Sequence, residues 1–220
     1  MRINKFVAQA TGISRRAADD AIRQGRVLLN SNTAALGDEV ITSDKVTLDG
    51  HEIVPAANMT IMLNKPRGYV TSREGQGAKT IYDLLPAEYH SLKPVGRLDK
   101  DSSGLILLTN DGELANQLTH PKYLKTKTYE IELDKPLEPL HQQIITDHGI
   151  DLEDGKSKLG LQKLDSDLSW QVTMSEGRNR QIRRTFEALG YRVTKLHRIS
   201  FGPYRLSQLS PTQRFSIIKA

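Results

Sequence analysis

The most informative stretch of this 220-residue chain is residues 96–108, which read GRLDKDSSGLILL. Residues 96–104 form a polar loop, and the apolar run Leu105-Ile106-Leu107-Leu108 after it has the pattern of a buried β-strand. Polar loops that enter buried strands often carry active-site groups. Asp99 is therefore the first candidate for a reactive carboxylate, and an ordinary Asp/Ser/Gly turn is the simpler alternative.

The same loop also matches part of a calcium-binding loop. Asp99, Asp101, Ser103 and Gly104 fall on the first, third, fifth and sixth positions of an EF-hand loop. The twelfth position is Asn110, where an EF-hand needs a bidentate Glu, and no helix pattern precedes the loop. A calcium site is therefore the weaker interpretation.

Strand and helix patterns outside this loop predict the fold class. Strand patterns occur at residues 61–63, 105–108, 129–133 and 170–174, and helix patterns near 114–118, 140–146 and 179–189. Their alternation is irregular, and the sequence has no glycine-rich phosphate loop. We therefore predict an α+β domain with a mostly antiparallel mixed β-sheet flanked by helices, and not a doubly wound fold.

The N-terminal region predicts two short helices backed by short strands. The first predicted helix covers residues 4–12, with Asn4 as its N-cap. Ser14 caps a second helix that runs from Arg15 to Gln24 and is ended by Gly25. Such a small unit can bury only a thin core.

The domain boundaries follow from composition. Pro55-Ala56-Ala57-Asn58 is the best linker candidate. We therefore predict a small domain over residues 1–54 and a larger one over residues 60–220.

The composition restricts the protein class. The chain contains no cysteine, which excludes disulfides and thiolate metal sites. No apolar run is long enough for a membrane span, and the N-terminus lacks the apolar core of a signal peptide. We expect a cytoplasmic protein.

The positive charge is concentrated in two places. Of the net charge of +5, residues 1–26 carry six Lys/Arg against Asp19 and Asp20, and residues 176–198 carry seven Lys/Arg against Glu176 and Glu187. Local basic patches on a modestly charged protein indicate contact with a polyanion. Solvated surface charge is the alternative explanation.

Tyr129 lies in the strand pattern KTKTYEIEL at residues 125–133. Alternate residues of a strand share a face, so Lys127, Tyr129, Ile131 and Leu133 should lie together. The tyrosine is then either a core residue with its hydroxyl at the rim or a stacking surface for a base.

Four arginines lie close together at residues 178–184, where a helix pattern begins. Positive charge at a helix N-terminus is unfavourable unless an anion is near. A bound phosphate or a carboxylate partner would remove this conflict, and an exposed basic helix is the alternative.

Together these segments resemble the RsuA-type family of ribosomal RNA pseudouridine synthases. The resemblance covers nearly the whole chain, through LNKPRGYVTS at 63–72, GRLDKDSSGLILLTNDGELAN at 96–116, KTKTYEIEL at 125–133 and EGRNRQIRRTFEALGYRVTKLHRI at 176–199. Residues 1–53 resemble the αL RNA-binding domain first seen in a small-subunit ribosomal protein.

The resemblance implies the site and the reaction. Asp99 would be the catalytic carboxylate, Arg183 would pair with it, Tyr129 would stack on the target uracil, and Ile182 would line the pocket. The protein would isomerise a uridine of ribosomal RNA to pseudouridine, with the large subunit favoured over the small. The reaction rearranges one nucleotide, so no metal or other cofactor is expected.

The resemblance also implies the partner. Ribosomal RNA, free or in a subunit assembly intermediate, would bind a monomeric protein that does not contact a membrane. The residues expected to contact RNA are Lys5, Arg15, Arg16, Arg23, Arg26, Arg178 and Arg180. The alternative is a non-catalytic RNA-binding or ribosome assembly factor. That alternative predicts the loss of Asp99, Tyr129 or Arg183, yet the sequence keeps all three.

Overall fold

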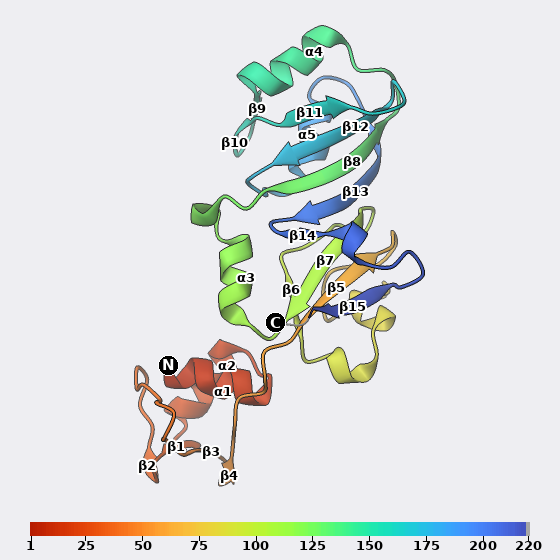
Figure 1. Ribbon diagram of the computed structural model, residues 1–220. Coiled ribbons are helices and arrows are strands. Elements are labelled where there is room, and N and C mark those ends of the chain that lie inside the picture. Colours follow the sequence, from red (N-terminus) through yellow and green to blue (C-terminus); the bar gives the residue numbers. More distant parts are fainter. Residues whose placement is uncertain (219–220) are drawn as a thin grey trace. The chain divides into compact units, whose positions relative to one another are not determined.

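The computed structural model describes residues 1–218, and the chain divides into two compact units, one from Met1 to Met59 and the other from Thr60 onward (Figure 1). Within the described residues, no helix is long and apolar enough to cross a membrane.

The N-terminal unit combines two helices, α1 (Ile3–Thr11) and α2 (Arg15–Arg23), with a four-stranded sheet of order β2-β1-β3-β4. The strands are β1 (Val27–Leu29), β2 (Asn32–Thr33), β3 (Val46–Leu48) and β4 (His51–Glu52). The core is small, as its length predicts, and includes Ile3, Val7, Ala18, Ala21, Ile22 and Val27.

One of the two predicted helix caps is confirmed and the other is wrong. The Ser14 side chain accepts a hydrogen bond from the Ala17 amide at 3.1 Å, which caps α2 as predicted. The residue before α1 is Arg2, whose side chain makes no capping bond. Asn4 lies inside α1, and its side-chain amide donates to Asp19 Oδ1 at 2.7 Å, so it links α1 to α2 instead.

The larger unit is built on a nine-stranded sheet. Its main order is β11-β12-β8-β13-β7-β5-β15, while β14 pairs with β13 and β6 pairs with β7. The strands are β5 (Thr60–Lys65), β6 (Lys93–Val95), β7 (Ser103–Thr109), β8 (Lys127–Leu133), β11 (Gly160–Lys163), β12 (Ser169–Met174), β13 (Val193–Phe201), β14 (Tyr204–Arg205) and β15 (Phe215–Ile218). Among these described strands only the β7–β13 pairing is parallel, which confirms the predicted α+β fold with a mostly antiparallel sheet.

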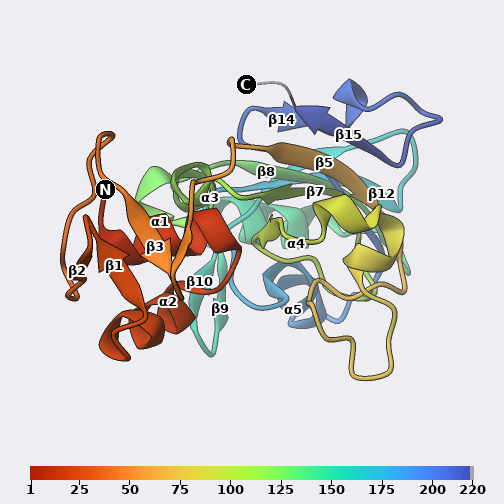
Figure 2. The ribbon, with the colours of Figure 1, turned by 90° about the horizontal axis from the view of Figure 1, so that it is seen from below.

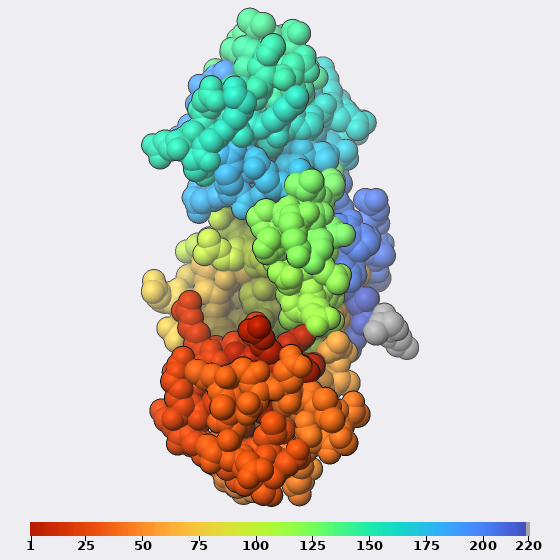
Figure 3. Space-filling view, turned by 90° about the vertical axis from the view of Figure 1, so that its left-hand side faces the viewer, coloured from red at the N-terminus to blue at the C-terminus, as the bar shows by residue number. Residues whose placement is uncertain are grey.

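Helices and a small hairpin flank this sheet. The helices are α3 (Gly112–Thr119), α4 (Pro139–Gln143), which continues as the π-helical turn η4 (Ile144–His148), and α5 (Gln181–Glu187). Figure 2 shows α5 and the hairpin of β9 (Ile150–Leu152) and β10 (Gly155–Ser157) on the same face of the sheet. The short 3-10 turns are η1 (Ile81–Leu84), η2 (Ala87–Tyr89), η3 (Pro121–Tyr123) and η5 (Leu206–Gln208). In the space-filling view, α3 and η3 stand out from the surface in light green (Figure 3).

The arginine-rich segment is shorter as a helix than its sequence predicts. Arg180 adopts a left-handed conformation with φ of 46°, so α5 begins at Gln181 and not at Asn179. The chain then forms the long strand β13, which the sequence patterns did not predict. A register shift between Arg198 and Ser200, and the buried Arg198 at an inward position, hide the usual alternation of apolar and polar residues.

Candidate active site

The loop that carries Asp99 leaves β6 and returns to the sheet as β7. Beneath it lies Lys65, the last residue of β5, whose side chain is fully buried. Lys65 Nζ donates to the carbonyl oxygens of Asp99 at 2.9 Å, Ser102 at 2.6 Å and Pro66 at 3.2 Å. The ammonium group therefore holds the loop at both sides of its turn.

Burial lowers the pKa of Lys65 to about 8, although the charges of Asp99 and Asp101 act in the opposite direction. The sequence patterns did not single out this residue, because Lys65-Pro66-Arg67-Gly68 has the composition of an exposed turn. One feature of the sequence could have predicted a role for Lys65: it follows the apolar strand pattern Ile61-Met62-Leu63 closely. A lysine that is buried there must find polar partners.

Gly104 lets the loop pass close to β13. Its φ is 103°, and a Cβ atom there would overlap the carbonyl oxygen of Arg198. Both the positive φ and the lack of space for a Cβ atom therefore require glycine at this position. The loop therefore enters β7 at one fixed point against β13.

Two aspartates and two arginines form an ion-pair cluster at the mouth of the site. Arg180 Nη1 lies 3.5 Å from Asp99 Oδ2 and 3.2 Å from Asp101 Oδ1. Arg183 Nη2 lies 3.2 Å from Asp101 Oδ2, and its Nη1 donates to the Val193 carbonyl at 2.6 Å. Each carboxylate thus has an arginine partner.

The structure does not show the predicted ion pair between Arg183 and Asp99. Arg180, which the sequence resemblance assigned to RNA, is the ion-pair partner of Asp99. The reason is geometric: the hydrogen bond to the Val193 carbonyl holds the mostly buried Arg183 against β13, and from there it reaches Asp101. Left-handed backbone at Arg180 starts α5 late and leaves its side chain free to reach the loop.

The electrostatics of Asp101 follow from these contacts. Burial alone would raise the pKa of Asp101, but the hydrogen bond from Arg180 and the charge of Arg183 outweigh it and lower that pKa. Desolvation lowers the pKa of Arg183, and Asp101 opposes this change. Asp101 and Arg183 are therefore both charged at neutral pH.

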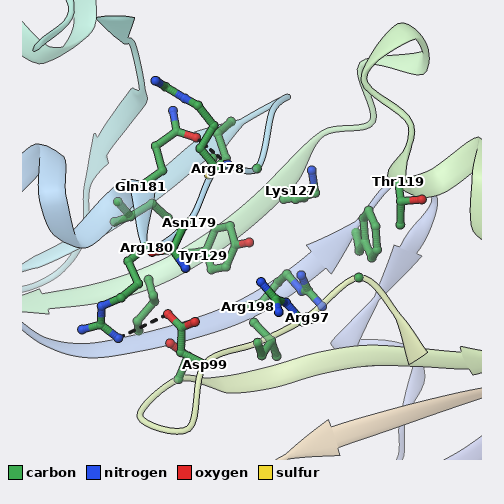
Figure 4. Close-up of a pocket in the computed structure, with 18 residues that line it drawn as sticks. Arg97, Asp99, Thr119, Lys127, Tyr129, Arg178, Asn179, Arg180, Gln181 and Arg198 are labelled. Carbon is green, nitrogen blue, oxygen red and sulfur yellow. Dashed lines mark hydrogen bonds and ion pairs between the residues drawn. The ribbon is translucent and has the colours of Figure 1, made fainter. Parts of the chain in front are cut away.

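Asp99 opens onto a pocket of about 290 Å³, which Tyr129 and Ile182 also line (Figure 4). Tyr129 is 7% exposed and Ile182 4% exposed, so the pocket presents an aromatic ring and an aliphatic side chain near the carboxylate. The structure therefore brings together Asp99, Tyr129 and Ile182 as predicted. Arg183 does not line this pocket and pairs with Asp101.

Arg178 also lines the pocket, but its guanidinium group is bound within the protein. Its nitrogens donate to Asp154 Oδ1 at 2.8 Å, to the carbonyls of Gly155 at 2.7 Å and Lys156 at 2.9 Å, and to Glu176 Oε1 at 3.2 Å. This arrangement joins the start of α5 to the β9–β10 hairpin. RNA contact through Arg178 would have to compete with these bonds.

The predicted RNA-contacting residues of the N-terminal unit lie on or beside its helices. Arg23 pairs with Asp20 at 2.7 Å, and Arg26 makes two hydrogen bonds to Asp49. Arg15 Nη2 lies 3.4 Å from Asn4 Oδ1. Arg16 is exposed, and its side chain makes no hydrogen bond or ion pair within the described residues. Lys5, on α1, is half-buried. Arg15 and Arg16 therefore keep most of their donors for a ligand.

No cluster of three or more possible metal ligands occurs among residues 1–218. Asp99 and Asp101, which the calcium interpretation requires as ligands, face arginines instead. The geometry gives the calcium interpretation no support.

Comparison with known families decides the class of protein. The model for RNA pseudouridylate synthases matches residues 59–188, and the model for the S4 domain matches residues 1–46. The chain belongs to the RNA pseudouridylate synthase family. It is thus an isomerase with an S4 domain and RNA as its partner, and the resemblance to RsuA-type synthases is confirmed.

Relatives of this pseudouridylate synthase cover almost its full length. The ribosomal large subunit pseudouridine synthase B of Bacillus subtilis is 40% identical over 91% of this chain and 85% of its own. The ribosomal small subunit pseudouridine synthase A of Pasteurella multocida is 36% identical over 94% of this chain and 90% of its own. A crystal structure of a pseudouridylate synthase covers 100% of this chain and 96% of its own, with 30% identity and a TM-score of 0.69.

Proposed function

We propose that this protein converts a specific uridine of ribosomal RNA to pseudouridine, with Asp99 as the catalytic carboxylate. The observation that carries the proposal is the position of Asp99. It lies on a loop held by Lys65, at a pocket lined by Tyr129 and Ile182, with Arg180 at 3.5 Å.

The reaction needs few chemical groups. The glycosidic C–N bond breaks, the base turns, and a C–C bond forms between C5 of uracil and C1′ of the ribose. The proton on C5 is released, and N1 gains one. Substrate and product are isomers, so the balance requires no oxidant or energy donor. An ionised carboxylate serves either route to bond cleavage, by attacking the ribose or by removing a proton from it.

The neighbouring arginines support this role. Arg180 lies next to Asp99 directly, and Arg183 acts through Asp101. A guanidinium group beside a carboxylate favours its ionised form and fixes its orientation. We assign Arg180 the role that the sequence resemblance gave to Arg183, and Arg183 the role of positioning Asp101.

Tyr129 and Ile182 provide the surface for the base. A uridine in folded RNA must leave its stack to reach Asp99, which costs a few kcal/mol. Stacking on an aromatic ring offsets about 1–3 kcal/mol per base. The nearly buried ring of Tyr129 suits this task, and Ile182 adds apolar surface to the same pocket.

The S4 domain would bind the RNA outside the catalytic pocket. Lys5, Arg15, Arg16, Arg23 and Arg26 are the residues proposed for phosphate contacts on helical RNA, and Arg15 and Arg16 have the most free donors. We propose the large subunit RNA as substrate over the small. The relatives include a synthase named for the large subunit and one named for the small subunit.

The experiment compares pseudouridine maps of ribosomal RNA from a strain that lacks this protein and the same strain carrying the wild type, Asp99→Asn or Asp165→Asn. Asp165 is exposed and far from the site in sequence, so its variant is the matched control. We expect one position to lose pseudouridine without the protein, and to regain it with the wild type and Asp165→Asn only. Full restoration by Asp99→Asn would support the non-catalytic assembly factor.

A further inference from the structure

The catalytic pocket contains more positive charge than its carboxylates balance. Arg178 and Arg180 are paired with acids, but Arg97, Lys127 and Arg198 also line the pocket and form no ion pair within the described residues. Arg97 is exposed, so water solvates its charge. Arg198 is buried and Lys127 is half-buried, and these two cations carry the inference.

Arg198 is buried with an unused donor. It is 2% exposed, and its Nε donates to the Leu105 carbonyl at 2.7 Å. Its Nη2 is buried and has no hydrogen-bond partner in the described part of the chain. The guanidinium carbon lies 4.9 Å from the centre of the Phe201 ring, which packs against it. A buried charge with an unmade hydrogen bond is costly, so a purely structural role would favour a neutral residue here.

Lys127 has a similar environment on the neighbouring strand. Its Nζ donates to the Glu176 carbonyl at 3.1 Å and lies 5.5 Å from the centre of the Phe201 ring. Burial, and then the charge of Arg198, lower the pKa of Lys127. A Cβ atom on Gly177 would lie 3.3 Å from Nζ, so glycine leaves space beside the ammonium group.

We propose that Lys127 and Arg198 form a binding site for a phosphodiester group next to the target uridine. The proposal rests on the proposed function, since it names the part of the RNA that this pocket holds. Uracil and ribose are neutral, so the phosphodiester is the group of the substrate that can balance the buried Arg198 and the half-buried Lys127. Arg198 also lines the pocket, so its guanidinium group can pair with the same phosphate.

The sheet places Lys127 and Arg198 close enough to Tyr129 for one nucleotide to contact all three residues. Arg198 is directly opposite Tyr129 across the β8–β13 pairing. Lys127 lies two residues before Tyr129 on the same face of β8, which is about 7 Å along a strand. This spacing is comparable with the span from a pyrimidine ring to the phosphate of its own nucleotide. With the base on Tyr129, its phosphate therefore reaches Lys127.

The test is a double-mutant cycle between protein and RNA. A stem-loop containing the uridine mapped above is made with a neutral methylphosphonate at the 5′ or the 3′ phosphate of that uridine. Its KM and kcat are measured with the wild type, Lys127→Met and the control Lys195→Met, which removes a lysine on β13 that does not line the pocket. Melting curves check that both variants are folded.

We expect one of the two methylphosphonates to raise the KM of the wild type and of Lys195→Met about 10-fold, as for loss of a charge-assisted hydrogen bond. Lys127→Met should have a similarly raised KM on normal RNA and lose little more with that methylphosphonate. If each methylphosphonate raised the KM of Lys127→Met by the same factor as that of the wild type, the proposal would be overturned. Such additivity of the protein and RNA changes is what a purely structural lysine would give.

A second measurement does not depend on activity. Uridine 5′-monophosphate, uridine 3′-monophosphate and uridine are titrated into the full chain labelled with 13C-lysine, with the Lys127 signal assigned by its loss in Lys127→Arg. A shift with a monophosphate and not with uridine supports the anion site. An equal shift with uridine, or none with any nucleotide, contradicts it, whereas the absence of any mapped uridine contradicts only the proposed function.

Discussion

Lys65 is a fully buried lysine whose pKa is lowered to about 8 by burial. It places an ammonium group in the interior of the larger unit and uses it to bind the backbone of the catalytic loop. The cost of burying this charge is offset by hydrogen bonds to three carbonyl groups, those of Pro66, Asp99 and Ser102. A residue that contacts no substrate in the proposed mechanism therefore sets the position of Asp99.

This burial predicts a dependence of stability on pH. The pKa of Lys65 is about 8 in the folded protein and 10.5 in an unfolded chain. Between these pH values the unfolded chain binds more protons, so the contribution of Lys65 to the free energy of unfolding rises with pH, by about 3 kcal/mol in total. Denaturant unfolding of the wild type and Lys65→Met at several pH values from 7 to 10.5 measures it.

The difference in unfolding free energy between wild type and Lys65→Met should grow above pH 8. Lys100→Met, which removes an exposed lysine of the same loop, should differ from the wild type by an amount that is constant over this pH range. A flat difference for Lys65→Met would mean that Lys65 keeps an ordinary pKa.

At the scale of elements, the junction between β7 and β13 fixes the catalytic loop. Gly104→Ala would place a Cβ atom onto the Arg198 carbonyl at a φ of 103°. We expect this variant to lose at least about 3 kcal/mol of stability, since both overlap and backbone strain oppose it. Gly112→Ala is the control, because Gly112 begins α3 with open space around its Cα and an ordinary φ. Denaturant unfolding should show little change for Gly112→Ala, and equal stability of the two variants would contradict the junction.

The sequence predicted the elements that have a regular local pattern. The Ser14 cap, strands β5, β7, β8 and β12, and the polar loop before β7 were all accessible in this way. Strand β13 was not, because Arg198 points inward and a register shift interrupts the alternation. The exchange of ion-pair partners between Arg180 and Arg183 depends on one left-handed residue, which no periodicity in the sequence indicates.

At the scale of the whole molecule, the proposed division of work assigns RNA affinity to the S4 domain. Arg15→Ala combined with Arg16→Ala should weaken RNA binding and reduce the slope of log affinity against log salt by about 0.7–0.9 for each phosphate that the variant no longer neutralises. Lys158→Ala combined with Lys163→Ala removes the same charge from the surface of the larger unit and is the control. Fluorescence anisotropy over a range of salt concentrations measures the slope, and an unchanged slope would argue against phosphate binding by Arg15 and Arg16.

The most direct test of the central claim is a single-turnover assay of purified protein on a ribosomal RNA transcript that contains the mapped uridine. We predict that Asp99→Asn slows pseudouridine formation by a factor of about 10² to 10⁴ or more while the melting temperature and RNA affinity stay near those of the wild type. Asp101→Asn should lose less activity, because Asp101 contacts the arginines and not the pocket. A folded Asp99→Asn protein that forms pseudouridine at the wild-type rate would contradict a catalytic role for Asp99.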